Sequence, residues 1–131
     1  MKKYFCVLAV LCALPSIADE GWTLISTNSD FEYSGKHGSF ERVRNKSNDM
    51  VFVIVGREVN KKTKNIGVEK WYVRDSDCRR KQGKIVTLSI NGDFKYDNDF
   101  VFGAGNVASG MAEFICSIEG AVKAADDRKG L

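Results

Sequence analysis

The amino-acid sequence predicts an α+β domain, in which an antiparallel β-sheet comes first and a single helix follows. Three observations support this prediction. Short segments rich in aromatic and β-branched residues run from Trp22 to about Tyr96, with turn-forming residues between them. The most apolar of these, residues 50–55, is too short for a typical helix. From Asn106 onward the apolar residues change to helical spacing, which predicts a C-terminal helix laid on one face of the sheet.

The first 18 residues are typical of a cleavable secretory signal peptide. Two lysines give a positive start, residues 4–14 are almost all apolar, and Ser16 and Ala18 place small residues at positions −3 and −1 of a cleavage site. The apolar run is shorter than the roughly 20 residues that span a bilayer. We expect cleavage after Ala18 and an exported single domain of residues 19–131. The alternative, lipid attachment at Cys12, is disfavoured because Leu11 stands where lipidation needs a small residue.

The N-terminal half of the mature chain is predicted to form four strands. Residues 22–27 and 31–34 are expected to pair as a hairpin around the turn-prone residues 28–30. Residues 40–45 continue the sheet. Residues 50–55 are β-branched and uniformly apolar, which indicates a central strand with both faces covered.

The next predicted strand covers residues 68–77 and is followed directly by a cysteine. Its alternation places Trp71 and Val73 on one face and Tyr72 on the other, and Cys78 follows directly. We expect Trp22 and Trp71 in the core rather than on a ligand platform.

A second hairpin is predicted further along the chain. Residues 84–90 alternate strictly, and the Asn-Gly pair at 91–92 is the strongest short hairpin signal in the sequence. Residues 94–96 should therefore run back antiparallel, and residues 97–99 should form a turn.

The C-terminal helix is predicted to begin at Asn106, a suitable N-cap. Cys116 lies on the flank of the apolar stripe, from which it can reach the sheet. The stripe itself consists of Val107, Met111, Phe114, Ile115, Ile118 and Val122.

A disulfide between Cys78 and Cys116 is expected, because Cys6 and Cys12 leave with the leader and an even pair remains in an oxidising compartment. Removal of 18 of the 131 residues leaves 113, with 18 basic and 17 acidic residues, because two lysines are lost. This near-neutral balance gives no general attraction for nucleic acid or membranes.

The residues do not support a catalytic or metal site, and we expect no cofactor. The single histidine, His37, lies in a glycine-flanked loop without a motif, where a general base would need a partner. Asp97 and Asp99 lack the later Gly and Glu of a calcium loop. Asp75 and Asp77 share a predicted strand face like a glycosidase pair, but neighbouring arginines favour ion pairs instead.

Basic residues gather in two segments. Clusters of this kind can dock an anionic partner, or they can be solvated turns that keep the chain soluble. We take them as the candidate partner-binding residues: Lys61, Lys62 and Lys64 in one loop, and Arg79, Arg80, Lys81 and Lys84 after Cys78.

The order of parts resembles the surface-adhesin protein E family of Gram-negative bacteria, over roughly residues 21–122. The resemblance rests on the early Trp22, on Asp77-Cys78-Arg79 and on the helix segment 112–116 with its own cysteine. It implies a curved antiparallel sheet of about six strands, a C-terminal helix in its concave face, and a strand-to-helix disulfide onto which Cys78 and Cys116 map.

The function we expect is that of an exported, non-enzymatic protein-binding module. The resemblance implies display at the cell surface and binding of host matrix or serum proteins, although the lipidation site of the characterised adhesin is missing. The partner is expected to be another protein, with the periplasm, the cell surface or the medium as the location. The alternative is a periplasmic inhibitor or immunity-type protein that blocks a secreted enzyme, and a small hydrolase ranks third.

Overall fold

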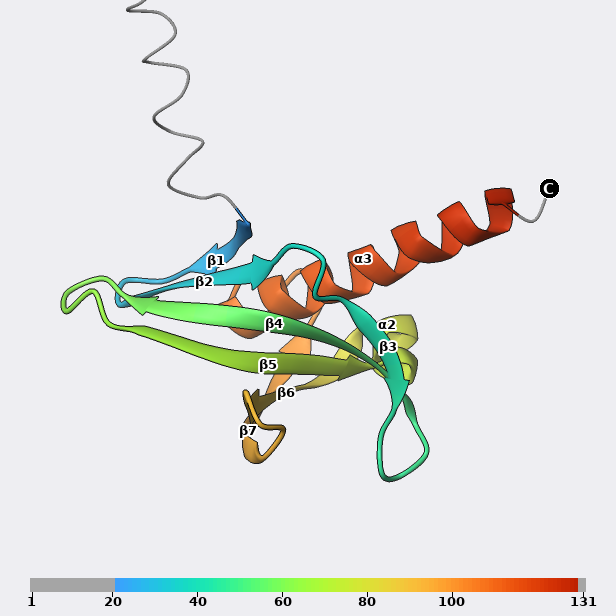
Figure 1. The fold of residues 1–131 in the computed structure, drawn as a ribbon, viewed down its shortest axis with the longest axis horizontal. Coiled ribbons are helices and arrows are strands. Elements are labelled where there is room, and N and C mark those ends of the chain that lie inside the picture. Colours follow the sequence, from blue (N-terminus) through green and yellow to red (C-terminus); the bar gives the residue numbers. More distant parts are fainter. Residues whose placement is uncertain (1–20, 130–131) are drawn as a thin grey trace, which may run out of the picture.

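A computed structural model describes residues 21–129. The predicted leader, with Cys6 and Cys12, lies outside these residues. Figure 1 shows a curved sheet with a long helix against it. In chain order the elements are β1 (Trp22–Thr27), β2 (Phe31–Lys36), β3 (Glu41–Arg44), β4 (Met50–Asn60), β5 (Ile66–Arg74), α2 (Asp75–Arg80), β6 (Gln82–Ser89), β7 (Phe94–Val101) and α3 (Val107–Lys129).

All strand pairs of the sheet are antiparallel, in the order β1-β2-β4-β5-β6-β7. β4 is the central strand, and it is long enough to pair with two partners along one edge. Its first part pairs with β3, at Val51↔Val43, and its second part with β2, at Gly56↔Gly35. The predicted α+β class, with an antiparallel sheet and a C-terminal helix on one face, is confirmed.

One face of the sheet, the helix face, packs against α3. Alternation along the strands brings Phe52 and Ile54 from β4 and Trp71 and Val73 from β5 to this face, where all four are buried. From α3 the core receives Met111, Ala112 and Ile115. The amphipathic stripe predicted from Asn106 onward is therefore the packing surface as far as Ile118, and the predicted stripe residue Val122 lies outside the side chains that the structure describes.

The start of α3 is fixed by the predicted cap. The side-chain oxygen of Asn106 accepts a hydrogen bond from the backbone N–H of Ser109, at 2.9 Å. This is the bond by which an N-cap satisfies a free amide of the first helical turn. In Figure 1 the helix crosses behind β2 and β4 and then extends past the end of the sheet.

The other face of the sheet, called the open face below, differs from the prediction. The sequence indicated a central strand covered on both sides, but α3 covers only the face with Phe52 and Ile54. On the open face Val51 is buried, while Val53 and Val55 remain partly exposed. A uniformly apolar strand does not reveal whether its second face meets another layer.

Two local predictions are wrong. The expected turn at residues 97–99 lies within β7, where Asp97 and Asp99 pair with Val86 and Lys84 of β6. The expected strand over 68–77 ends at Arg74, and Asp75–Arg80 forms the short helix α2. Both errors involve aspartates, whose low strand propensity is overridden by pairing in β7 and whose helix-start preference prevails in α2.

The predicted disulfide joins Cys78 to Cys116, with the Cα atoms 5.6 Å apart. Because Cys78 lies in α2 rather than in a strand, the bridge connects two helices. It holds the turn between β5 and β6 against the middle of α3. Since disulfides persist in oxidising compartments, the bond is consistent with an exported protein.

Candidate binding sites

The structure places the two basic segments at opposite ends of the β4–β5 hairpin. Lys61, Lys62 and Lys64 form the turn between the strands, next to the pair Val59↔Ile66. The segment Arg79–Lys84 follows the far end of β5, beyond the pair Val51↔Arg74. Figure 1 shows the hairpin turn and α2 at the two extremes of the sheet, so the segments do not form one surface.

The charges of the second segment are largely compensated. Arg79 pairs with Asp75 at 2.5 Å, Arg80 pairs with Asp77, and the Lys84 ammonium lies 2.7 Å from Asp99. The pairs of Asp75 and Asp77 are the ion pairs that the sequence favoured over a glycosidase pair. Lys81 takes part in none of these three ion pairs. Its backbone is left-handed, with φ of 61°, and it ends α2 as the C-cap residue.

In the first segment only part of the charge faces solvent freely. The Lys61 ammonium donates to the backbone carbonyl of Asn28 at 2.6 Å and so ties this turn to the β1–β2 turn. The side chain of Asn60 accepts the backbone N–H groups of Lys62 and Thr63. Lys62 and Lys64 are exposed. The turn is therefore a rigid platform for two lysines.

His37 lies in the β2–β3 connection, and its ring hydrogen-bonds the exposed Thr23 hydroxyl at 2.6 Å. The Arg57 guanidinium lies over the Trp22 ring, 4.7 Å from its centroid, so this tryptophan is on the open face and not in the core where it was expected. Trp71 is fully buried in the core, as expected.

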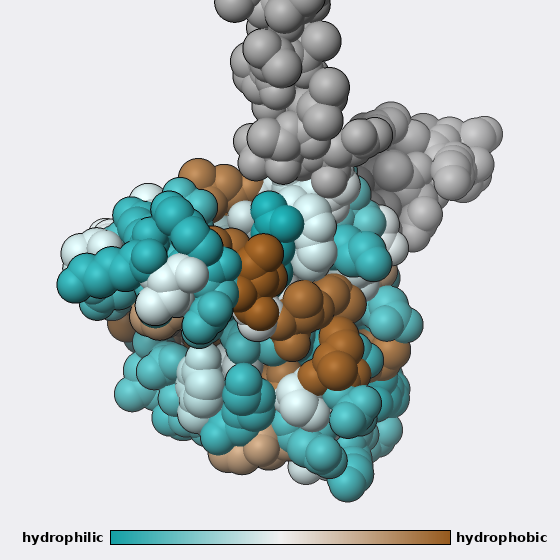
Figure 2. Space-filling model, turned by 60° about the vertical axis from the view of Figure 1, so that its left-hand side comes forward, coloured by the Kyte–Doolittle hydropathy of each residue, from teal (hydrophilic) through white to brown (hydrophobic). Residues whose placement is uncertain are grey.

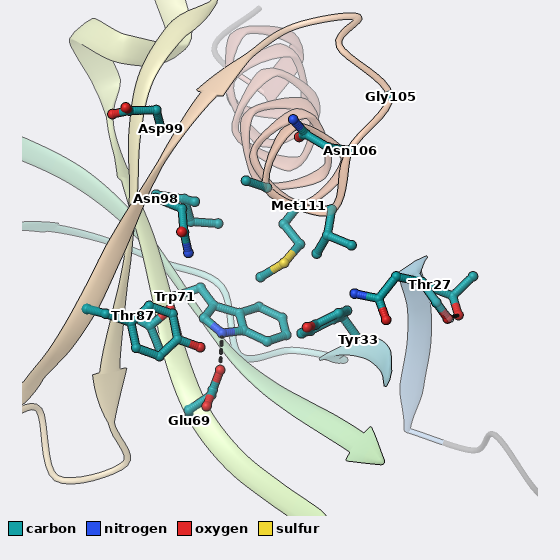
Figure 3. Close-up of a pocket in the computed structure, with 15 residues that line it drawn as sticks. Thr27, Tyr33, Glu69, Trp71, Thr87, Asn98, Asp99, Gly105, Asn106 and Met111 are labelled. Atoms are coloured by element: carbon teal, nitrogen blue, oxygen red, sulfur yellow. Dashed lines mark hydrogen bonds between the residues drawn. The ribbon is translucent and has the colours of Figure 1, made fainter. Parts of the chain in front are cut away.

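A hollow of about 560 Å³ lies on the helix face, between the start of α3 and strands β5 to β7. Figure 3 shows the indole of Trp71 at its centre, with Tyr33 and Thr27 on one side and Thr87 and Asn98 on the other. Its volume falls in the range of small-molecule sites. Met111 of α3 reaches down toward the indole and closes the upper wall.

The hollow contains a buried carboxylate, that of Glu69, a residue only 4% exposed. Its Oε2 accepts the Trp71 indole N–H at 2.6 Å, drawn as a dashed line in Figure 3. Its Oε1 lies 3.4 Å from the Lys95 ammonium. This carboxylate has a place in the core because the indole N–H and the ammonium compensate its charge.

Burial and neighbouring carboxylates raise the pKa of three groups around Glu69. Burial raises the pKa of Tyr96, and the charges of Glu69 and Glu58 raise it further. Burial is also the main cause of the raised pKa of Tyr33, to which Glu58 adds. The pKa of Glu58 itself is raised, first by burial and then by the charge of Glu69. Each group is therefore held toward its protonated form.

A second hollow, the open-face groove, has a volume of about 510 Å³. Its walls are the β3–β4 loop and the β6–β7 turn. Val43 and Phe94 stand exposed in it, with exposed fractions of 39% and 64%. Six apolar or aromatic side chains line it: Val43, Val51, Val53, Tyr72, Leu88 and Phe94.

The polar residues around the open-face groove sit on its rim. They come from the end of β3, as Arg44, from the β3–β4 loop, as Asn45, Lys46 and Ser47, and from Asp93 of the opposite turn. An apolar floor with a polar rim is the usual make-up of a protein-binding patch. Figure 2 shows, on the face turned to the reader, hydrophobic residues gathered in a central band between hydrophilic ones.

Comparison with protein-family models, with curated proteins and with solved structures gave no match for this chain. Within residues 21–129, no group of three or more His, Cys, Asp or Glu side chains is placed to hold a metal ion. No helix in that part of the chain is both long and apolar enough to cross a membrane.

Sequence reasoning missed both hollows. The signal for the first was present, because Glu69 alternates with Trp71 and Val73 and so falls on the apolar face of its strand. A lone carboxylate at such a position indicates a compensated buried charge. The open-face groove left no comparable signal, since its walls are two loops that meet only in the folded sheet.

Proposed function

We propose that this chain is an exported, non-enzymatic protein-binding module that engages its partner through the open-face groove. The observation that carries the proposal is the apolar open face. An antiparallel sheet with one solvated face normally carries polar residues there. Here Val43, Phe94 and the floor of Val53, Tyr72 and Leu88 form an apolar hollow instead.

Further apolar side chains are exposed on the open face beyond the groove. Ile66 and Val68 of β5 have exposed fractions of 59% and 47%. Val68 lies opposite Arg57, and the polar residues Arg57 and Ser34 separate it from Leu24 of β1. Large exposed apolar patches on small proteins mark interaction surfaces.

The sequence features support a partner met outside the cytoplasm. The leader of residues 1–18 is of the secretory type, and the Cys78–Cys116 bond suits an oxidising compartment. The resemblance to the surface-adhesin protein E family favours a host matrix or serum protein as the partner. The exposed lysines Lys62 and Lys64 are placed to steer an acidic partner toward the hairpin end of the sheet.

The test is binding of purified serum and extracellular-matrix proteins to the immobilised, oxidised protein of residues 19–131. We expect saturable binding to one of them. Phe94→Ser should weaken it by about tenfold or more, because aromatic anchors in apolar pockets carry much of an interface's binding energy. Leu24→Ser is the matched control, since it removes an equally exposed apolar side chain outside the groove.

Equal losses of binding affinity for Phe94→Ser and Leu24→Ser would show that the groove is not part of the interface. Binding confined to one enzyme of the bacterial envelope, in a tight one-to-one complex, would instead favour the inhibitor function. Absence of any protein partner in both sets would contradict the proposal.

A further inference from the structure

The carboxylate of Glu69 is built to meet a positive charge. Its side chain is 5% exposed, and the alternation of β5 turns it toward the helix face beside Trp71. The indole N–H satisfies Oε2, but a neutral donor does not balance the charge. A buried carboxylate is tolerated only with a compensating charge or hydrogen bonds. The remaining oxygen, Oε1, therefore needs a cation.

The cation that the chain itself supplies is loosely held. Lys95 reaches Oε1 from β7 at 3.4 Å, whereas charge-assisted N–H···O bonds are about 2.7–2.9 Å long. Its side chain is 46% exposed and has long, flexible methylene links. An ammonium thus already lies beside Oε1, at the long distance of 3.4 Å, where another ammonium can replace it.

The walls of the hollow suit the organic part of a molecule that carries an ammonium group. The aromatic side chains of Tyr33, Trp71 and Tyr96 surround the carboxylate, and Ile85 and Met111 provide apolar surface. Aromatic rings attract cations through their faces. None of the described residues that line the hollow is a lysine or arginine. Burial is the main cause of the raised pKa values of Tyr33, Tyr96 and Glu58, and the charge of Glu69 adds to each.

We infer that this hollow binds a small organic cation, an ammonium group on an aromatic or aliphatic body, whose nitrogen replaces that of Lys95 on Glu69. Two sources carry this chemistry: a free amine and a lysine side chain of another protein. The site lies on the helix face, opposite the open-face groove, so it does not depend on the proposed protein interface.

The test uses the indole N–H signal of Trp71 in ¹⁵N–¹H NMR spectra of the oxidised protein. The chain has two tryptophans, and Trp22→Phe assigns the two indole signals. Benzylamine should shift the Trp71 signal in a saturable way, because its ammonium alters the charge on the hydrogen-bonded carboxylate. Benzyl alcohol and benzoate, of similar shape, should leave the signal in place.

Two variants move the affinity in opposite directions. Glu69→Gln keeps an acceptor for the indole but removes the charge, and we expect benzylamine binding to weaken about tenfold or more. Lys95→Met removes the competing internal cation, and affinity should rise several-fold, because a site occupied by its own side chain is less available. Lys36→Met, at an exposed position elsewhere, is the control.

The inference is overturned if benzyl alcohol shifts the Trp71 signal as much as benzylamine does, or if benzylamine gives no saturable shift. It is also overturned if Lys95→Met leaves the affinity for benzylamine unchanged. This second variant keeps the inference testable if Glu69→Gln does not fold. Nα-acetyl-lysine methylamide separates the sources. Binding as tight as that of benzylamine supports a protein side chain as the ligand, and much weaker binding supports a free amine.

Discussion

At the scale of single residues, Gly56 shows how tightly the core is packed. A Cβ atom at this position would lie less than 3 Å from several atoms of the Trp71 ring. The indole therefore rests directly on the β4 backbone, and this contact sets the depth of the hollow. Glycine is needed here for the close approach of a ring to a strand rather than for a turn.

We expect Gly56→Ala to lower the free energy of unfolding by about 1–3 kcal/mol, the usual cost of overpacking a dense core. Gly67→Ala is the matched control, because it lies in the neighbouring strand with nothing within 4 Å of the added methyl group. Urea unfolding followed by circular dichroism measures both. Equal stability of the two variants would contradict the packing argument.

Asp77 is the most completely buried acidic side chain among the described residues, and it organises α2. Burial alone would raise its pKa. The hydrogen bonds from Arg80, Arg74 and the backbone N–H of Lys84 outweigh burial and hold the pKa below the ordinary value of 3.8. The sequence pattern predicts instead a carboxylate at the exposed end of a strand.

The lowered pKa gives a pH dependence with a definite sign. Because the folded-state pKa lies below the unfolded one, the carboxylate stabilises the fold above about pH 3.8, and this contribution is lost as the pH falls through the folded pKa. Asp77→Asn should cost about 1–3 kcal/mol at neutral pH. Urea unfolding between pH 7 and pH 3 should show the gap to wild type closing, whereas Asp93→Asn, in an exposed turn, should show no such gap.

At the scale of elements, α2 and α3 are coupled through one bond. The bridge between Cys78 and Cys116 closes a loop with a sequence separation of 38, and α2 also packs on β6, whose Lys84 N–H meets Asp77. In the chain-entropy model a loop of this size contributes roughly 4 kcal/mol. The disulfide thus keeps the β5–β6 connection seated against the helix.

Cys78→Ser and Cys116→Ser should each destabilise the protein by about 2–5 kcal/mol, the usual cost of losing a native disulfide in a small secreted domain. Their effects should not add, because either change breaks the same bond. Thermal unfolding of both single variants and the double variant checks this. A double variant about twice as damaging as each single one would show that the two thiols act separately.

At the scale of the whole molecule, the leader predicts the form in which the protein leaves the cytoplasm. Intact-mass analysis of exported material should give an unmodified N-terminus at Asp19, together with the loss of two hydrogens that marks the disulfide. A diacylglyceryl mass on Cys12 would contradict both the cleavage site and a soluble exported form.

The sequence by itself determined most of the strands, the C-terminal helix and the two hairpins, but not the short helix α2 or the pairing of β4 with β2, β3 and β5. Periodicity, turn residues and the N-cap are local properties, so the first hairpin, the Asn-Gly turn and the start of α3 were all predictable. Cysteine counting was enough for the disulfide, because only one pair lies outside the predicted leader. The basic segments were also visible, and so were the arginine pairs of Asp75 and Asp77, but the pairing of Lys84 with Asp99 was not.

Only the tertiary structure decided which face of the sheet is covered and where the hollows lie. Residues far apart in sequence, such as Val43 and Phe94 or Glu69 and Lys95, meet because strand register and sheet curvature bring them together. No local pattern encodes such distances, since alternation assigns a residue to a face without stating what lies opposite. The two proposed binding sites therefore depend on the fold. The sequence contains all of their residues but does not show that these residues come together.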